Sequence, residues 1–122
     1  MLIDDNEDIT DLLGHQFRRS GYKVIVAGSG EEALELFRSN CLPDFILLDV
    51  QLPDMSGPEL LDQLQEDFPF ILERTPVMFY TAGLPPDDGR ASGCLSKMSD
   101  ATQIIAEVKN CVPLEKKVPA FI

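Results

Sequence analysis

The sequence predicts an α/β domain in which a parallel β-sheet is covered by helices on both faces. Two observations predict it: short apolar runs alternate with segments whose apolar residues recur at helical spacing, and no repeat or low-complexity tract interrupts that alternation. The length of 122 residues is typical of one compact domain, and an apolar content of 44% is sufficient for one buried core.

The predicted strands are the short apolar runs. The first comprises only residues 1–3 before the chain turns acidic, so we expect that strand to begin ahead of this sequence. The third, residues 45–48, is continuously apolar, which is typical of a strand covered on both faces. The other strands are predicted at residues 22–27, 77–80 and 94–96.

Four helices are predicted from apolar periodicity and capping residues. Their starts are predicted near Ile9, Ser29, Pro58 and Asp100. Ser29 with Glu32, and Ser56 with Glu59, have the spacing of a capping box, in which the hydroxyl and the carboxylate each accept a hydrogen bond from a free amide of the first turn. The last helix, about residues 100–112, is predicted to bury Ile104, Ile105, Val108 and Cys111.

The connection between the last two strands is short. Residues 82–96 contain two prolines and three glycines, so they leave room for little more than one or two helical turns. We therefore expect the helix of this connection, which would be the fourth of the domain in chain order and precede the one at 100–112, to be shortened. The domain is predicted at residues 1–112, and residues 113–122, which have two prolines and no periodic pattern, are predicted to be a C-terminal tail or linker.

Charge and composition exclude several classes of function. The net charge of −11 would repel both a phosphate backbone and an anionic membrane surface, so we expect no direct contact of this domain with nucleic acid or membranes. Three scattered cysteines are too few for a disulfide framework and indicate reduced thiols. With no apolar stretch of membrane-spanning length and no signal peptide, we expect a cytoplasmic protein.

Polar side chains follow the predicted strands where each strand ends. Asp4 and Asp5 follow the first strand, Asp49 the third, Thr81 the fourth and Lys97 the fifth. Because the carboxyl ends of parallel strands meet at one edge of the sheet, we expect these side chains to lie together there. Either aspartate of the adjacent pair could instead cap the first helix, but one side chain cannot readily serve both roles.

Three carboxylates gathered at one edge need a cation. At separations of about 4 Å, each pair would repel by roughly 4 kcal/mol at an effective dielectric constant of 20. Mg²⁺ favours sparse carboxylate sites that water and phosphate complete, and with the Lys97 ammonium it would neutralise the three aspartates. Such a site can accept a phosphoryl group, with Asp49 as the nucleophile, Asp4 and Asp5 as metal ligands and Thr81 as a hydrogen-bond donor.

The ordered set of motifs resembles the receiver domain of two-component response regulators. The matching elements are the acidic pair Asp4-Asp5, the segment from Asp49 to Gly57, the triplet around Thr81, and Lys97. The resemblance implies a doubly wound, flavodoxin-like sheet of strand order 2-1-3-4-5. It also implies Mg²⁺ as cofactor, with Asp4, Asp5 and Asp49 as ligands and the Gln51 backbone carbonyl completing the metal shell.

The same resemblance implies how the protein works. Asp49 would take a phosphoryl group from a histidine kinase or a histidine phosphotransfer protein, and Thr81 would move together with an aromatic residue of the fifth strand. Two positions depart from the family pattern: Cys94 replaces that aromatic residue and Met98 replaces the proline after the lysine. These departures affect the relay that transmits the signal, whereas the phosphorylation pocket is complete.

Two functions remain open at this stage. The leading hypothesis is a phosphorylation-dependent signalling switch that catalyses only its own phosphorylation and slow self-dephosphorylation; the alternative is a receiver-like interaction module whose binding ignores phosphorylation. A phosphohydrolase with an aspartate nucleophile is disfavoured, because Gln51 stands where such enzymes resembling the haloacid dehalogenase family need a second aspartate. The sequence leaves open the kinase, homodimer formation and whether an output domain follows.

Overall fold

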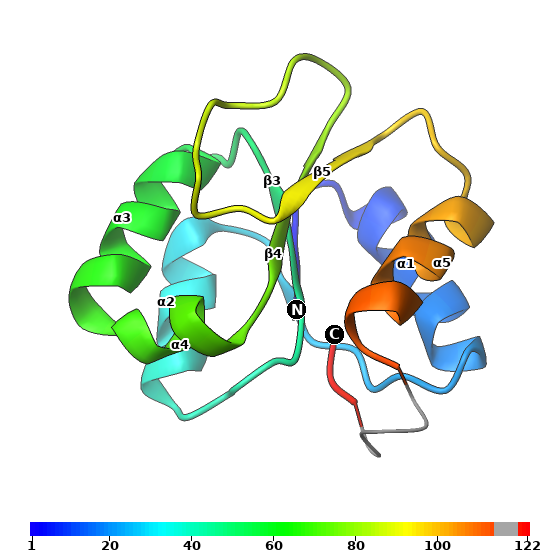
Figure 1. The fold of residues 1–122 in the computed structure, drawn as a ribbon, viewed down its shortest axis with the longest axis horizontal. Helices are drawn as coiled ribbons and strands as arrows, with labels where there is room; N and C mark the ends of the chain where they lie inside the picture. Colours follow the sequence, from blue (N-terminus) through cyan, green and yellow to red (C-terminus); the bar gives the residue numbers. More distant parts are fainter. Residues whose placement is uncertain (114–119) are drawn as a thin grey trace.

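The computed structural model describes residues 1–113 and 120–122 and contains a five-stranded, entirely parallel sheet (Figure 1). The strands lie in the order β2-β1-β3-β4-β5, so the predicted fold class and strand order are confirmed. Their bounds are β1 (Leu2–Ile3), β2 (Val26–Ala27), β3 (Ile46–Asp49), β4 (Val77–Thr81) and β5 (Gly93–Ser96).

Among the described residues, five helices cover the two faces of the sheet. Helices α1 and α5 lie on one face, and α2, α3 and α4 lie on the other (Figure 1). Their bounds are α1 (Glu7–Arg19), α2 (Gly30–Arg38), α3 (Gly57–Asp67), α4 (Pro69–Arg74) and α5 (Ala101–Cys111). None of the helices among the described residues is both long enough and apolar enough to span a bilayer.

The core consists of two apolar layers that the sheet separates. Side chains of alternating strand residues enter opposite layers, as the two-residue period of a strand requires. Ile3, Leu48 and Phe79 pack with α2, α3 and α4, whereas Leu2 and Leu47 pack with α1 and α5. This double coverage explains why β3 is apolar throughout.

The capping residues agree with the predictions in part. The Ser29 and Ser56 hydroxyls accept hydrogen bonds from the Glu32 and Glu59 amides, as expected. The Glu32 carboxylate, however, accepts from the amide of Gly28 rather than from that of Ser29. A complete capping box is formed at α5, between Asp100 and Gln103.

The predicted helix between the last two strands is absent. Residues 82–92, all of which are described, contain no helix, and α4 lies instead between α3 and β4. Adjacent prolines at 85 and 86 cannot donate backbone hydrogen bonds, which disfavours a helix in so short a connection. The contraction predicted from the sequence is therefore more complete than expected.

One guanidinium group fastens this connection to α3. Arg90 forms ion pairs of 2.7 Å with both Asp88 and Asp62, and it donates hydrogen bonds to the Gln65 side chain and the Pro58 carbonyl. The pairing with the two carboxylates raises the pKa of Arg90 against the opposing effect of burial. The loop is thus held where a helix was predicted.

The C-terminal part of the chain differs from the sequence-based expectation in two further ways. Cys111, predicted to be buried, is exposed at the end of α5, whereas the next residue, Val112, is buried in the core. Within the predicted tail, Ala120 and Ile122 are fully buried. Residues 114–119 of that tail lie outside the described residues.

Asp54 connects the loop after β3 to the start of α2. Its two carboxylate oxygens accept hydrogen bonds from the amides of Gly30 and Glu31, at 2.9 and 2.8 Å. These bonds from the amides of Glu31 and Gly30 lower the pKa of the Asp54 carboxyl. A carboxylate at a helix N-terminus satisfies free amides and faces the positive end of the helix dipole.

We expect Asp54→Ala to reduce the free energy of unfolding at pH 7 by about 0.5–2 kcal/mol, the cost of losing a helix cap. Because the pKa is lowered in the folded state, this stabilisation should be complete above the ordinary aspartate pKa of about 3.9 and should disappear as the pH falls through the folded value. Urea denaturation at pH 7 and pH 3 measures both effects, with the exposed Asp87→Ala as control. An equal difference at both pH values would contradict the assignment.

Candidate functional site

The carboxyl ends of the strands bring three carboxylates together. One oxygen each of Asp4, Asp5 and Asp49 lies within 4.8 Å of the others, a spacing compatible with a single metal ion. Asp4 and Asp49 are buried, at 5% and 8% exposure, and Asp5 is exposed. The structure thus gathers the three aspartates that the strand-end rule predicted.

The backbone around the site fixes the orientation of two of these side chains. The Asn6 amide donates to Asp4 Oδ1 at 2.9 Å, and the Gln51 amide donates to Asp49 Oδ1 at 3.3 Å. Asn6 also caps α1, because its side chain accepts from the amides of Asp8 and Ile9. The cap that the sequence assigned to Asp4 or Asp5 therefore belongs to Asn6, and neither aspartate caps α1.

Close packing of Gly57 helps to place the end of β3. A Cβ atom at this position would lie 2.8 Å from the Asp49 carbonyl oxygen, closer than real contacts of this kind. The Gly57 amide donates to the Val50 carbonyl at 2.7 Å, which folds the loop back onto the strand end. A side chain here would displace Asp49 or the start of α3.

Lys97 supplies the positive charge of the site. Its Nζ lies 3.0 Å from Asp4 Oδ2 and 3.2 Å from Asp49 Oδ2. Its amide donates to the Thr81 carbonyl at 3.0 Å, which extends the pairing of β4 with β5 and aims the side chain over the strand ends. The ammonium also lies 5.4 Å from the centroid of the Tyr80 ring.

The pKa shifts at the site reflect burial together with the charges gathered there. Burial, with the Asp4 charge adding to it, raises the pKa of Asp49, and the Gln51 amide and Lys97 only partly oppose this. Burial lowers the pKa of Lys97, but the ion pairs with Asp4 and Asp49 outweigh it, so the net shift is upward. Lys97 is therefore a cation at neutral pH and the pocket retains an excess of negative charge.

The donor set of the site suits a hard cation. Asp4 Oδ2 is buried, with the Lys97 ammonium 3.0 Å away as its counter-charge. Carboxylate oxygens gathered at this spacing are the ligands that a hard divalent cation prefers. The aspartate oxygens and their spacing therefore fit Mg²⁺.

The remaining predicted residues lie around this cluster. Thr81 ends β4, where the neighbouring Tyr80 is paired with Asp49, and its hydroxyl accepts a hydrogen bond from the Gly83 amide at 3.1 Å. Gln51 lies in the loop after Asp49 and is bridged to Ser56. Tyr80 was not predicted as a site residue. The sequence feature that could have indicated it is an aromatic residue next to Thr81, at the end of a strand that reaches the site.

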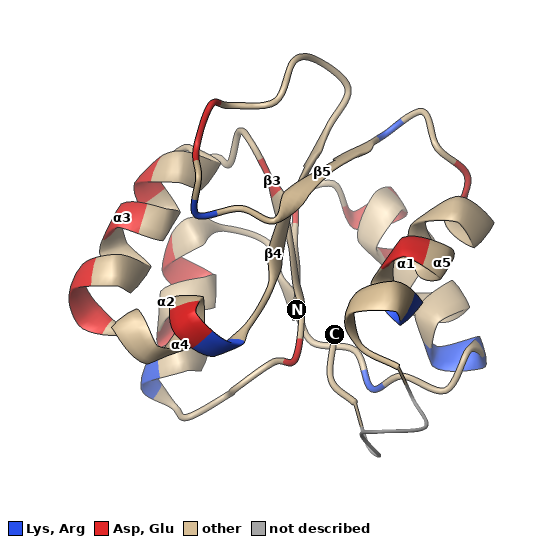
Figure 2. Cartoon of the chain, in the orientation of Figure 1, with Lys and Arg blue, Asp and Glu red and all other residues tan. Residues whose placement is uncertain are grey.

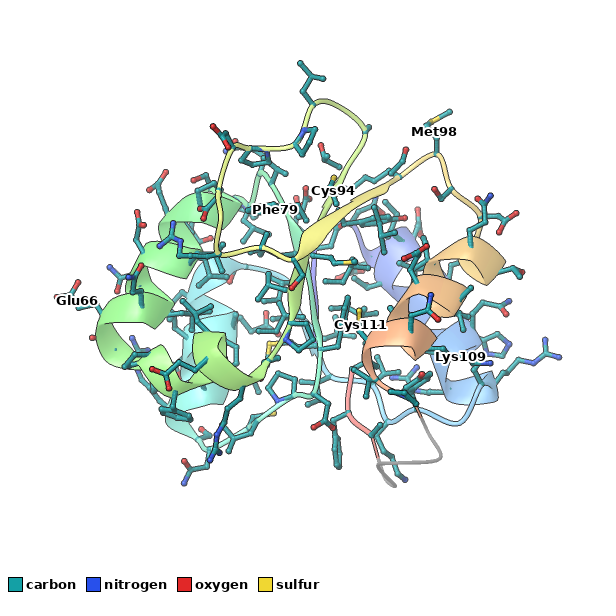
Figure 3. All side chains as sticks on the ribbon, in the orientation of Figure 1. Glu66, Phe79, Cys94, Met98, Lys109 and Cys111 are labelled. Atoms are coloured by element: carbon teal, nitrogen blue, oxygen red, sulfur yellow. The ribbon has the colours of Figure 1, made fainter. Side chains whose placement is uncertain are left out.

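The two departures from the family pattern are both solvent-accessible. Cys94 is exposed on the edge strand β5, next to Phe79 of β4 in the sheet. Met98 is 85% exposed, and Figure 3 shows its side chain pointing away from the domain at the turn after Lys97. Neither side chain takes part in the acidic cluster.

Comparison with known proteins agrees with this geometry. Residues 1–109 match the response regulator receiver domain family. The chain belongs to this family. As a receiver domain it is a signalling module of two-component systems, not a classical enzyme.

Two curated relatives illustrate the similarity. The polar-differentiation response regulator DivK of Brucella ovis is 36% identical over 116 residues, which cover 90% of this chain and 92% of DivK. The alkaline phosphatase synthesis transcriptional regulatory protein PhoP of Bacillus subtilis is 43% identical over 75 residues, which cover 59% of this chain and only 31% of PhoP. The chemotaxis response regulator CheY4 of Vibrio cholerae shares the fold, with a TM-score of 0.78 at 24% identity over 91% of this receiver and 95% of the CheY4 chain.

We expect Asp4→Asn to lower the pKa of Asp49 in metal-free protein, because the Asp4 charge is one of the causes that raise it. A carbon-13 NMR titration of the Asp49 carboxyl, in the presence of a chelator, measures the shift. Asp11→Asn, an exposed change on α1, serves as the control and should leave the titration unchanged. An unchanged or higher Asp49 pKa in Asp4→Asn would contradict the described electrostatics.

Proposed function

We propose that this receiver domain is a phosphorylation-dependent switch that accepts a phosphoryl group on Asp49 in a Mg²⁺-dependent reaction. The observation that carries the proposal is the placement of Lys97 Nζ, within 3.2 Å of both Asp4 and Asp49, beside a third carboxylate of the same cluster. Ion pairs for stability alone would not require Asp4 and Asp49 to share one ammonium group beside a third carboxylate.

Each residue has a distinct role in the transfer. An Asp49 carboxylate oxygen attacks the phosphorus of a phosphohistidine, the P–N bond breaks, and the histidine nitrogen leaves with the bond's electron pair. Lys97 stabilises the charge that develops on the phosphoryl oxygens, and the Thr81 hydroxyl donates to one of them. Asp4, Asp5, Asp49 and the Gln51 carbonyl would hold Mg²⁺, which would supply charge neutralisation and orient the phosphoryl group.

The proposed partners follow from this chemistry. The donor is a sensor histidine kinase or a histidine phosphotransfer protein, and we place the reaction in the cytoplasm. Phosphorylation adds about one further negative charge at Asp49, which alters the loops that surround it. Loop 82–92 is the segment best placed to respond, since it begins directly after Thr81.

Incubation with acetyl phosphate and Mg²⁺ should add one phosphoryl group to the protein, as measured by intact mass. Asp49→Asn should show no addition, because an amide lacks the nucleophilic oxygen, and a chelator should abolish it in the parent. Asp54→Asn, which changes a neighbouring aspartate outside the cluster, is the matched control and should still be labelled. Absence of labelling in the parent under these conditions would refute the proposed function.

The aspartyl phosphate should be short-lived, because Gly83 leaves the phosphoryl group open to water. A Cβ atom at Gly83 would contact only the Thr81 hydroxyl, at 3.9 Å, so a larger side chain can be accommodated. We expect Gly83→Met to lengthen the lifetime of the phosphorylated protein. Intact-mass measurements at successive times, which record the loss of the added phosphoryl mass, give this lifetime. Gly89→Met, whose Cβ would contact nothing, should decay at the parental rate.

A second candidate function rests on the missing helix. Because Arg90 fastens loop 82–92 to α3 and Cys94 replaces the aromatic residue of the relay, partner binding could be independent of phosphorylation. Beryllofluoride with Mg²⁺ mimics the phosphoryl group and separates the two functions. A switch should shift the amide NMR signals of residues 82–96, whereas unchanged signals there, with Asp49 visibly occupied, would favour the second candidate.

A further inference from the structure

Tyr80 lies between the strand that bears Asp49 and the strand that leads to Lys97. In the sheet it is paired with Asp49 of β3 on one side and with Leu95 of β5 on the other. Paired residues of neighbouring strands point to the same face of a sheet, and Tyr80 and Leu95 both enter the core layer of α1 and α5. Asp49 therefore lies on this face, and so does Lys97, two positions after Leu95.

The Lys97 side chain has to cross β4 to reach the acidic cluster. Two inter-strand spacings, together about 10 Å, separate β5 from β3. The ammonium nevertheless lies 3.2 Å from Asp49 Oδ2 and 3.0 Å from Asp4 Oδ2. The part of β4 that it crosses is the Tyr80 ring, whose centroid is 5.4 Å from Lys97 Nζ.

The ring attracts the ammonium without occupying its hydrogen-bond donors. The face of an aromatic ring carries partial negative charge, and a cation within about 6 Å of the centroid is attracted to it. Because the ring offers no lone pair to the ammonium, the three N–H groups of Lys97 remain available to carboxylate and phosphoryl oxygens. Tyr80 is 5% exposed and the Lys97 side chain 20%, so water screens this attraction only in part.

The contribution of the ring should be largest when the cluster holds a cation. The ion pairs of Lys97 depend on the negative charge of Asp4 and Asp49, and Mg²⁺ bound to these carboxylates would share that charge and repel the ammonium. The attraction of the Tyr80 ring does not depend on the carboxylates. An aliphatic side chain at this position would fill the core but would exert no such attraction.

We propose that Tyr80 is a positioning residue, whose ring holds the Lys97 ammonium over Asp49. The part of this inference that concerns phosphoryl transfer rests on the proposed function. The ring carries the role and the hydroxyl does not, so phenylalanine should replace Tyr80 and an aliphatic residue should not.

Carbon-13 relaxation of the Lys97 Cε methylene tests the positioning without a phosphoryl donor. In the parent, the order parameter of this methylene should exceed that of the exposed Lys109. Tyr80→Leu should lower it toward the Lys109 value, and the decrease should be larger with Mg²⁺ than without, because the ring then provides the attraction that remains. Tyr80→Phe should keep the parental value in both conditions. Tyr80→Met, whose flexible side chain refills the space, serves as a second variant without a ring.

A buried aromatic residue of the same core layer provides the matched control. Phe17 is fully buried and packs edge-to-face on Tyr22, with 5.8 Å between the ring centroids. Phe17→Leu also removes an aromatic ring from this layer, so it reproduces the loss of packing but should leave the Lys97 methylene unchanged. A parental order parameter in both ringless Tyr80 variants, or an equal decrease in Phe17→Leu, would overturn the proposal.

The rate of labelling by acetyl phosphate at saturating Mg²⁺ tests the same role in the proposed reaction. Tyr80→Leu should be labelled roughly three- to tenfold more slowly than the parent, the range expected for a cation–π attraction at a half-buried site. Tyr80→Phe and Phe17→Leu should be labelled at the parental rate. In Lys97→Met, which removes the ammonium, Tyr80→Leu should cause no further slowing, because the ring has no cation to hold.

The outcomes of the labelling experiment separate three explanations. Equal slowing by Tyr80→Leu with and without the Lys97 ammonium would show that the ring does not act through Lys97, which would overturn the proposal. Slowing by Tyr80→Phe as large as that by Tyr80→Leu would assign the role to the hydroxyl and would also overturn it. If the parent is not labelled at all, the proposed function fails, whereas the relaxation measurement still decides whether Tyr80 positions Lys97.

Discussion

The balance between one ammonium group and three carboxylates governs this receiver domain. Lys97 follows the edge strand β5, and Asp4 follows β1 on the far side of β3 and β4, so their ion pair depends on the register of all the strands between them. An error of one residue in any pairing would turn a site residue to the opposite face of the sheet. The charged site and the sheet therefore specify each other.

Two side-chain ties next to the strand ends help to preserve this register. Arg90 holds the connection that leads from β4 into β5, and Asp54 ties the loop after β3 to α2, so two of the strand ends are braced by single side chains. Figure 2 shows why a cation such as Arg90 is suited to fastening this connection to α3, since α3 carries acidic residues and no basic ones.

The sequence was sufficient for the sheet and the acidic cluster because both follow from topology. Apolar runs predict the strands, and parallel connections align the carboxyl ends of those strands. The meeting of Asp4, Asp49 and Lys97 can therefore be predicted without knowing how the side chains pack. Capping of α1 by Asn6 was missed because Asp4, Asp5 and Asn6 are adjacent and each has a side chain that can cap a helix. The burial of Ala120 and Ile122 was missed because so short a segment carries no period and its hydrogen-bond partners are some 80–100 positions away in the chain.

The position of Tyr80 beneath the Lys97 ammonium has a practical consequence for work with this protein. The chain has no tryptophan and two tyrosines, so its near-ultraviolet absorption and emission come almost entirely from Tyr22 and Tyr80. Tyr22 is anchored in the core by its hydroxyl bond to the Val112 carbonyl, remote from the strand ends. Tyr80 is thus a built-in optical probe, whose spectrum reports the charge above its ring without any attached dye.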